Sequence, residues 1–172
     1  MIAYGSFITY RKVTVSYTDL LGYTTGGAVA TLALTGLGGT TPANQLSAVN
    51  SGTLVVPAGA WLIGARMKVT ALFTGGSLAT LTASLGLSGG SATAIIGASD
   101  VLGSAVGAVY AQAASVLTTL NTTTLLPAYT PVVVFTPTTY ALSTLTAGQL
   151  DIELIYTNIS TTSSNTSYTP GV

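Results

Sequence analysis

Two of the four acidic residues of this sequence, Asp151 and Glu153, stand two positions apart in the apolar stretch TAGQLDIELIYT, residues 146–157. Paired carboxyl groups can perform glycoside hydrolysis, in which one is a general acid with a raised pKa and the other a nucleophile or base. Polar and apolar residues alternate here, with Ile152 between the two acids. Both carboxyl groups are therefore expected on one face of a β-strand.

A second pair of charged residues offers a structural explanation for the same pattern. Arg66 and Lys68 have the same spacing in another alternating stretch. On facing antiparallel strands, Arg66 could pair with one acid and Lys68 with the other, each pair contributing roughly 0.2–1 kcal/mol. The sequence favours this charge ladder, or a plain solvated strand face, over a catalytic dyad. We therefore expect no catalytic residues and no enzyme activity.

Other residue types that carry chemistry are scarce. The chain has no cysteine and no histidine, so thiolates and imidazoles cannot act as nucleophiles, bases or metal ligands. The stretch SGGSATAIIGASD supplies one carboxylate, Asp100, where calcium loops use several. The glycine-rich LTGLGGTT and LSGGSA lack the lysine and spacing of a phosphate-binding loop. We expect no metal site and no cofactor.

The low content of charged residues limits the classes of partner that the protein is expected to bind. Only 5% of the 172 residues are charged, and the net charge is zero, whereas soluble domains average roughly 25%. Without a basic cluster, nucleic acid is not an expected partner. The apolar runs are shorter than the ~20 residues of a membrane span, and the N-terminus does not read as a signal peptide; we expect no membrane association. A neutral surface favours assembly with other subunits.

Alternating apolar residues and glycine-rich turns predict an all-β chain. The 48% of hydrophobic residues argues against polar disorder. Strands are expected at residues 10–18, 28–34, 52–60, 60–73, 77–87, 127–142 and 148–157, with residues 88–117 left open. We predict a single domain over 1–172, an antiparallel β-sandwich or jelly roll. An N-terminal arm at about 1–10 and a polar C-terminal tail at about 158–172 are expected to flank it.

The clearest strand predicts the core. Apolar residues recur at every second position of residues 60–73, and the turn TGG suggests a hairpin with 77–87. Trp61 could stack on a sugar, but an aromatic residue in a strand is more often part of the core. The residues expected in the core are Trp61, Ile63, Met67, Val69, Phe73, Leu81, Leu85, Ile152, Leu154 and Tyr156.

Several motifs within residues 54–157 resemble a pattern of tailed-bacteriophage structural proteins. They are a PAG turn, a long strand into FTGG, a threonine-rich return strand, the stretch ASDV and the final strand LTAGQLDIELIYT. The chain is similar to small β-sandwich cement or decoration proteins of phage heads. This resemblance implies no catalytic residues.

From this resemblance we expect a virion structural protein on the outer capsid surface, assembled in the host cytoplasm. It would form a homotrimer, bind the major capsid protein and stabilise capsomer junctions. The alternative is a tail-fibre or receptor-binding module that recognises host surface polysaccharide. A pilus-like or surface-array subunit is a third possibility.

The N-terminal stretch MIAYGSFITY is expected to bind a partner. It is too short to fold alone, and strand addition to a neighbouring subunit would cover it. The partner-binding residues expected there are Ile2, Tyr4, Phe7, Ile8 and Tyr10.

Overall fold

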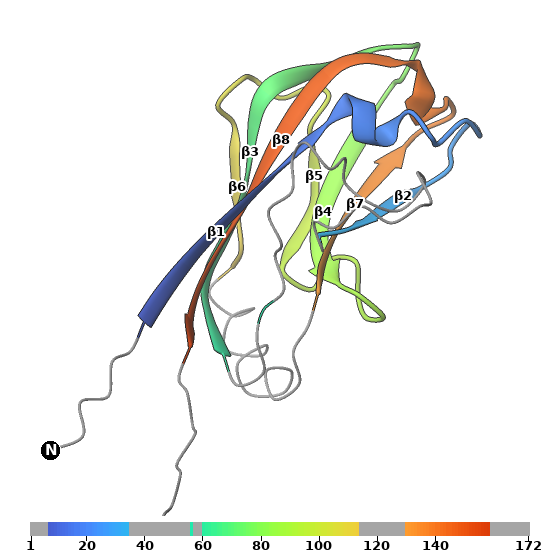
Figure 1. Cartoon of the computed structure of the whole chain (residues 1–172). Coiled ribbons are helices and arrows are strands. Elements are labelled where there is room, and N and C mark those ends of the chain that lie inside the picture. The colour runs from blue at the N-terminus through green and yellow to red at the C-terminus, as the bar shows by residue number, and fades with distance from the viewer. Residues whose placement is uncertain (1–6, 35–55, 57–59, 114–129, 159–172) are drawn as a thin grey trace, which may run out of the picture.

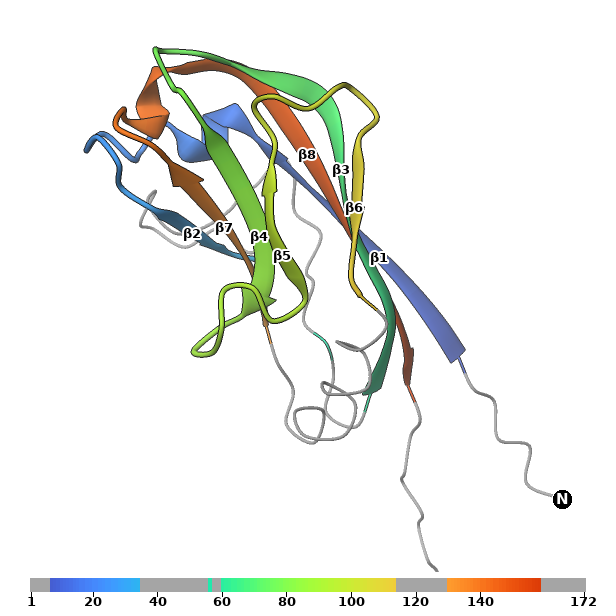
Figure 2. The same ribbon diagram turned by 180° about the vertical axis from the view of Figure 1, so that it is seen from behind.

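The computed structural model describes residues 7–34, 56, 60–113 and 130–158. Within these residues, eight strands form two four-stranded antiparallel sheets that face one another (Figure 1; Figure 2 shows the reverse side). The predicted all-β sandwich is confirmed. None of the helices in this part of the chain has the length and apolar character that crossing a bilayer requires.

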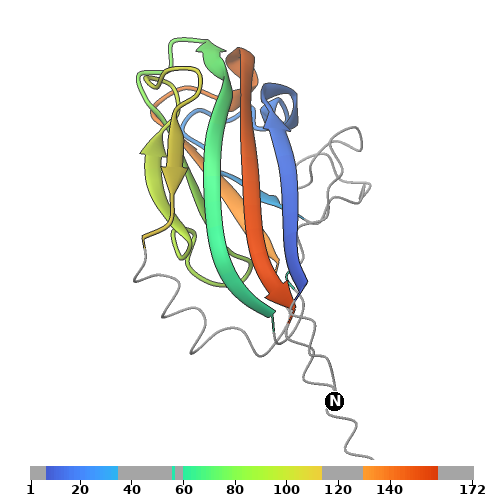
Figure 3. The ribbon, with the colours of Figure 1, turned by 90° about the vertical axis from the view of Figure 1, so that its left-hand side faces the viewer.

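We call the two layers the long sheet and the short sheet. The long sheet contains, in spatial order, β1 (Phe7–Ser16), β8 (Leu145–Asn158), β3 (Ala60–Gly75) and β6 (Val109–Ala111). The short sheet contains β2 (Ala30–Ala33), β7 (Pro131–Pro137), β4 (Leu81–Leu87) and β5 (Ile96–Asp100). Two short 3-10 helices, η1 (Tyr17–Leu20) and η3 (Leu142–Thr144), follow β1 and precede β8. Figure 3 shows the strands of the long sheet side by side.

Most of the predicted strands are present. The stretch 127–142 contains β7, a nearly continuous apolar run buried on both faces between β2 and β4. The open stretch 88–117 contains β5 and β6. Of the strand predicted at 52–60, the described residues are Val56, in an isolated bridge, and Ala60, the first residue of β3.

The inward faces of the two sheets form one core. Phe73 of the long sheet packs against Phe135 of the short sheet, with ring centroids 5.7 Å apart. Eight of the predicted core residues are buried, namely Met67, Val69, Phe73, Leu81, Leu85, Ile152, Leu154 and Tyr156. Burying a side chain of this size contributes roughly 1.5–3 kcal/mol, so this core dominates the stability of the sandwich.

The predicted hairpin between residues 60–73 and 77–87 is wrong. β3 pairs with β8 and β6, whereas β4 pairs with β7 and β5. The turn between them carries the chain from one sheet to the other through left-handed φ angles of 112° at Gly75 and 61° at Gly76. A Cβ atom at Gly75 would lie 2.5 Å from the backbone nitrogen of Thr146, so this crossing requires glycine.

The predicted burial of Trp61 and Ile63 is also wrong. Their side chains are 52% and 42% exposed, and Leu62 is buried instead. Leu62 lies opposite Tyr156 and Gly64 opposite Ile155, so β3 has one extra residue between these pairs. This β-bulge shifts the alternation by one position, and a pattern read back from Phe73 therefore places Trp61 on the wrong face.

The N-terminal arm predicted at about residues 1–10 overlaps the sheet. Residues 7–10 belong to β1 and pair with residues 155–158 of β8, so they are part of the sheet and not of an arm. Residues 1–6 and 159–172 lie outside the described residues. Phe7, Asn158 and Ala60 are in register at one end of the long sheet, which we call the terminal end.

Candidate functional site

The predicted carboxylate pair lies on the outer face of the long sheet, in its central strand β8. Asp151 lies between Thr14 of β1 and Lys68 of β3, and Glu153 lies between Lys12 and Arg66. Although they face away from the core, both acidic side chains are only 8% exposed. They are covered carboxyl groups and not members of a plain solvated face.

Asp151 is bound from β1. The ammonium Nζ of Lys12 lies 2.5 Å from Asp151 Oδ2, and the hydroxyl of Thr14 donates a hydrogen bond of 2.7 Å to Oδ1. The predicted ion pair of Lys68 with an acid is replaced by this one, although Lys68 is directly opposite Asp151. Lys12 is the diagonal neighbour, and a long flexible lysine side chain can span that distance.

Glu153 is bound from both neighbouring strands. Arg66 forms an ion pair with it through Nε, and the Tyr10 hydroxyl also hydrogen-bonds to it. Burial opposes ionisation of Glu153, but the hydrogen bonds from Arg66 and Tyr10 and the charges of Arg66 and Lys12 outweigh it, so the pKa of Glu153 is lowered. A general acid of a glycosidase needs a raised pKa. The lowered pKa instead favours a carboxylate that is ionised at neutral pH.

The cations respond in the complementary direction. The hydrogen bond to Asp151 raises the pKa of Lys12, and the hydrogen bond to Glu153 raises the pKa of Arg66. Lys12 and Thr14, which the sequence prediction missed, share the two-residue spacing of the acids in an alternating stretch. That spacing indicates that both side chains share one strand face and could contact the two acids.

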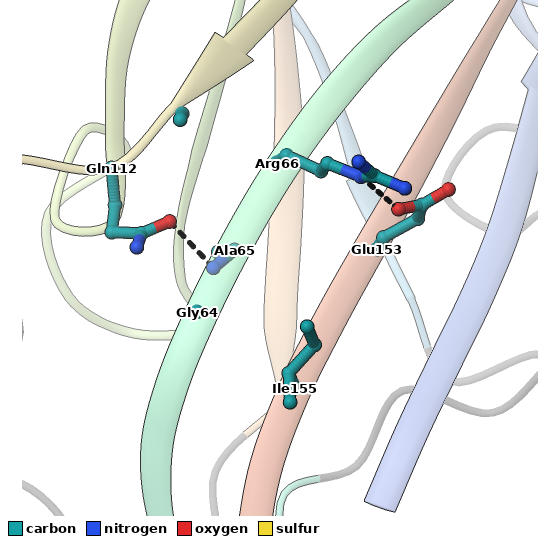
Figure 4. Close-up of a pocket in the computed structure, with 7 residues that line it drawn as sticks. Gly64, Ala65, Arg66, Gln112, Glu153 and Ile155 are labelled. Atoms are coloured by element: carbon teal, nitrogen blue, oxygen red, sulfur yellow. Dashed lines mark hydrogen bonds and ion pairs between the residues drawn. The ribbon is translucent and has the colours of Figure 1, made fainter.

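A pocket of about 290 Å³ opens on the same face, beside the Arg66–Glu153 pair (Figure 4). Gly64 and Gln112 both line it, and the side-chain amide oxygen of Gln112 accepts a hydrogen bond of 2.5 Å from the Ala65 backbone nitrogen. The pocket is lined by Gly64, Ala65, Arg66, Ala111, Gln112, Glu153 and Ile155. Sequence patterns do not predict this pocket, because Gln112 lies in residues 88–117, whose composition fits a loop, a helical turn or a strand.

Exposed apolar side chains gather between this pocket and the terminal end. We call this group the end patch; it consists of Ile8, Tyr10, Trp61, Ile63 and the half-buried Ile155. Ile8 and Trp61 flank Thr157 in one row of the sheet, and Tyr10 flanks Ile155 in a neighbouring row.

Of the predicted partner-binding residues, some belong to β1 and the others lie outside the described residues. Ile8 and Tyr10 are 69% and 52% exposed on the outer face, and Phe7 begins β1. Ile2 and Tyr4 lie outside the described residues. Among the residues that the structure describes, no three acidic side chains gather closely enough to hold a metal ion.

No protein-family model matches the sequence, and no curated protein matches it. Among solved structures, the chain is similar to the capsid of Ralstonia phage GP4. The two share 18% sequence identity over 91% of this chain and 88% of that chain, with a TM-score of 0.50. At this identity the likeness shows a shared fold.

Proposed function

We propose that the protein is a structural component of a phage virion that binds the outer surface of the assembled capsid as a cement or decoration protein. The observation that carries the proposal is the fold likeness to a phage capsid chain across nearly the whole length of both chains. The resemblance of the sequence motifs to phage-head accessory proteins points in the same direction.

The surface chemistry suits a role in assembly. The chain has no net charge, and its outer-face acids are neutralised by Lys12 and Arg66. Beside them, the end patch leaves several large apolar side chains exposed, which is typical of a surface that another protein covers. The major capsid protein and other copies of this chain are the proposed partners.

The proposed mechanism is mechanical and not enzymatic. A homotrimer seated over a capsomer junction would contact several capsid subunits at once, so that modest contacts combine into strong attachment. If it binds only the assembled lattice, it stabilises that lattice by mass action. The lowered pKa of Glu153 fits a structural carboxylate in such a protein.

Binding to capsids tests the proposal directly. Purified protein is mixed with assembled capsids that lack it, and the particles are sedimented and analysed by gel densitometry. We expect the protein to sediment with the capsids and to raise the temperature at which they rupture. Cryo-electron microscopy of the native particle should place the chain on the outside of the head; finding it only on tails would contradict the proposal.

The N-terminal segment is the proposed contact with the capsid, now with its boundary at residue 6. A variant lacking residues 1–6 should retain the sandwich, since β1 begins at Phe7, but should occupy fewer sites on capsids. A variant lacking residues 160–172 is the control and should lose far less occupancy. Equal occupancy of both variants would contradict a role for the N-terminal segment.

One observation favours the alternative of a polysaccharide-binding tail module. Trp61 and Tyr10 are both half-exposed on one sheet face, and exposed aromatic rings can stack on sugars. Binding of the isolated protein to host surface polysaccharide, measured by calorimetry, distinguishes the two functions. A capsid protein should show no saturable heat with polysaccharide and should sediment with empty heads.

A further inference from the structure

The end patch contains a protruding aromatic side chain. Trp61 is the single tryptophan of the chain, and it lies at the second position of β3 with half of its surface exposed. The bulge at Ile63 and Gly64 turns it outward, where the described strands form no further layer over the long sheet. Tryptophan is among the residues that most often anchor protein interfaces.

A cavity for such an anchor lies three residues along the same strand. The pocket of about 290 Å³ is lined by Gly64 and Ile155 among others, and it is large enough to hold an indole ring. The atoms nearest to a Cβ atom built at Gly64 would be in the side chains of Gln112 and Ile155, each 3.9 Å away. There is therefore free space at this position, which glycine leaves open and a larger side chain would occupy. The exposed guanidinium of Arg66 borders the pocket and could lie over an aromatic ring.

We propose that Trp61 of one copy of the protein docks into the Gly64 pocket of a second copy. The anchor and the pocket share one face and are separated along β3 by about 10 Å, at about 3.3 Å per residue. In a two-fold contact each copy would donate one tryptophan and receive one, whereas in a three-fold ring each would donate to the next copy. Either arrangement uses every anchor and every pocket once.

The charges on this face point to a second copy as the occupant. Asp151 and Glu153 are paired with Lys12 and Arg66, and the end patch itself has no formal charge. A strongly charged partner would find no complementary charge within the end patch, whereas the uncharged end patch of a second copy meets no repulsion there. The remaining cation of this face, Lys68, lies opposite Asp151, on the side of Arg66 away from the end patch. The second copy also presents the large aromatic side chain that the pocket can accept.

Tryptophan fluorescence tests the contact in the unmodified protein, because all of the tryptophan emission, excited selectively over tyrosine, comes from Trp61. We expect the emission to shift to shorter wavelength as the protein concentration rises, in parallel with the mass measured by light scattering. Quenching by acrylamide should weaken over the same range. Emission typical of an exposed indole at concentrations where the protein is oligomeric, or a monomer at every concentration, overturns the proposal.

Two variants remove the two sides of the contact. W61S removes the anchor, and G64V fills the pocket; each should weaken self-association at least about 30-fold, as expected for a central aromatic anchor. The matched controls are L72S, another exposed apolar residue of β3, and G97V, a strand glycine with open space around it in the short sheet. Both controls should associate like the wild type. Circular dichroism checks that all four variants are folded.

Mixing the two variants gives a positive test. W61S retains the pocket and G64V retains the only tryptophan, so adding W61S to G64V should shift the G64V emission to shorter wavelength. No shift in the mixture, or wild-type mass for either variant alone, overturns the proposal. The inference does not depend on the capsid role: failure to bind capsids leaves these results unchanged, and a capsid-binding protein that associates through another surface fails only here.

Discussion

Glu153 of β8 lies directly opposite Arg66 of β3 and forms an ion pair with it, in the row that also includes Lys12 of β1. This row joins three strands of the long sheet on the side away from the core. Its acid is held in the charged form, and that has a measurable consequence for stability.

Acid should destabilise the protein partly through Glu153. The pKa of this group is lower in the folded state than its ordinary value of 4.5. The unfolded chain therefore binds the proton more readily, and the stabilisation present above pH 4.5 is lost as the pH falls through the folded pKa. We expect the melting temperature of E153Q, measured by circular dichroism, to fall less steeply than that of the wild type below pH 4.5. An equally steep fall for E153Q and the wild type would contradict the assignment.

The partner of Asp151 can be identified by comparing two lysine variants. K12M removes the ion pair and leaves a covered carboxylate bound only by Thr14, so it should lower the free energy of unfolding by about 1 kcal/mol. K68M should change it by less than about 0.5 kcal/mol. Urea denaturation measures both, and a double-mutant cycle of K12M with D151N should show coupling that the cycle with K68M lacks. A larger effect of K68M would favour the pairing predicted from sequence.

The sequence predicted the parts of this fold that depend on local periodicity. Leu150, Ile152 and Leu154 are buried because alternation within one strand fixes which residues share a face. Alternation within a strand does not predict which strands lie beside it. Asp151 lies in a central strand with β1 on one side and β3 on the other, and spacing alone does not decide between Lys12 and Lys68.

The remaining errors have equally specific causes. The TGG turn resembles a hairpin turn, but its two left-handed glycines lead into the opposite sheet. Trp61 was misplaced by a single extra residue at the bulge. The pocket forms where β6, Gly64 and Gln112 come together, and residues so distant in sequence carry no common pattern.

Gly148 should be indispensable for packing of the core. Its φ angle is 141°, and a Cβ atom would lie 2.2 Å from the Phe73 ring. We expect G148A to lower the free energy of unfolding by about 2–4 kcal/mol, through backbone strain and overpacking. G97A, with open space and no left-handed φ, should stay within about 1 kcal/mol of the wild type. Adding F73L should partly rescue G148A, and no rescue would mean that the ring is not the obstacle.

The extra residue of the β3 bulge should be Ile63. Deleting Ile63 leaves a regular pairing in which Leu62 stays opposite Tyr156 and Trp61 stays opposite Thr157, so both residues should keep their faces. No buried side chain is lost, and we expect the free energy of unfolding to change by less than about 1 kcal/mol. At a concentration low enough to keep the protein monomeric, tryptophan emission should remain that of an exposed indole. I63A keeps the residue count and should retain the same exposed emission. Emission shifted to shorter wavelength in the deletion variant would mean that Trp61 has turned inward, and that Ile63 is not the residue that the bulge adds to the strand.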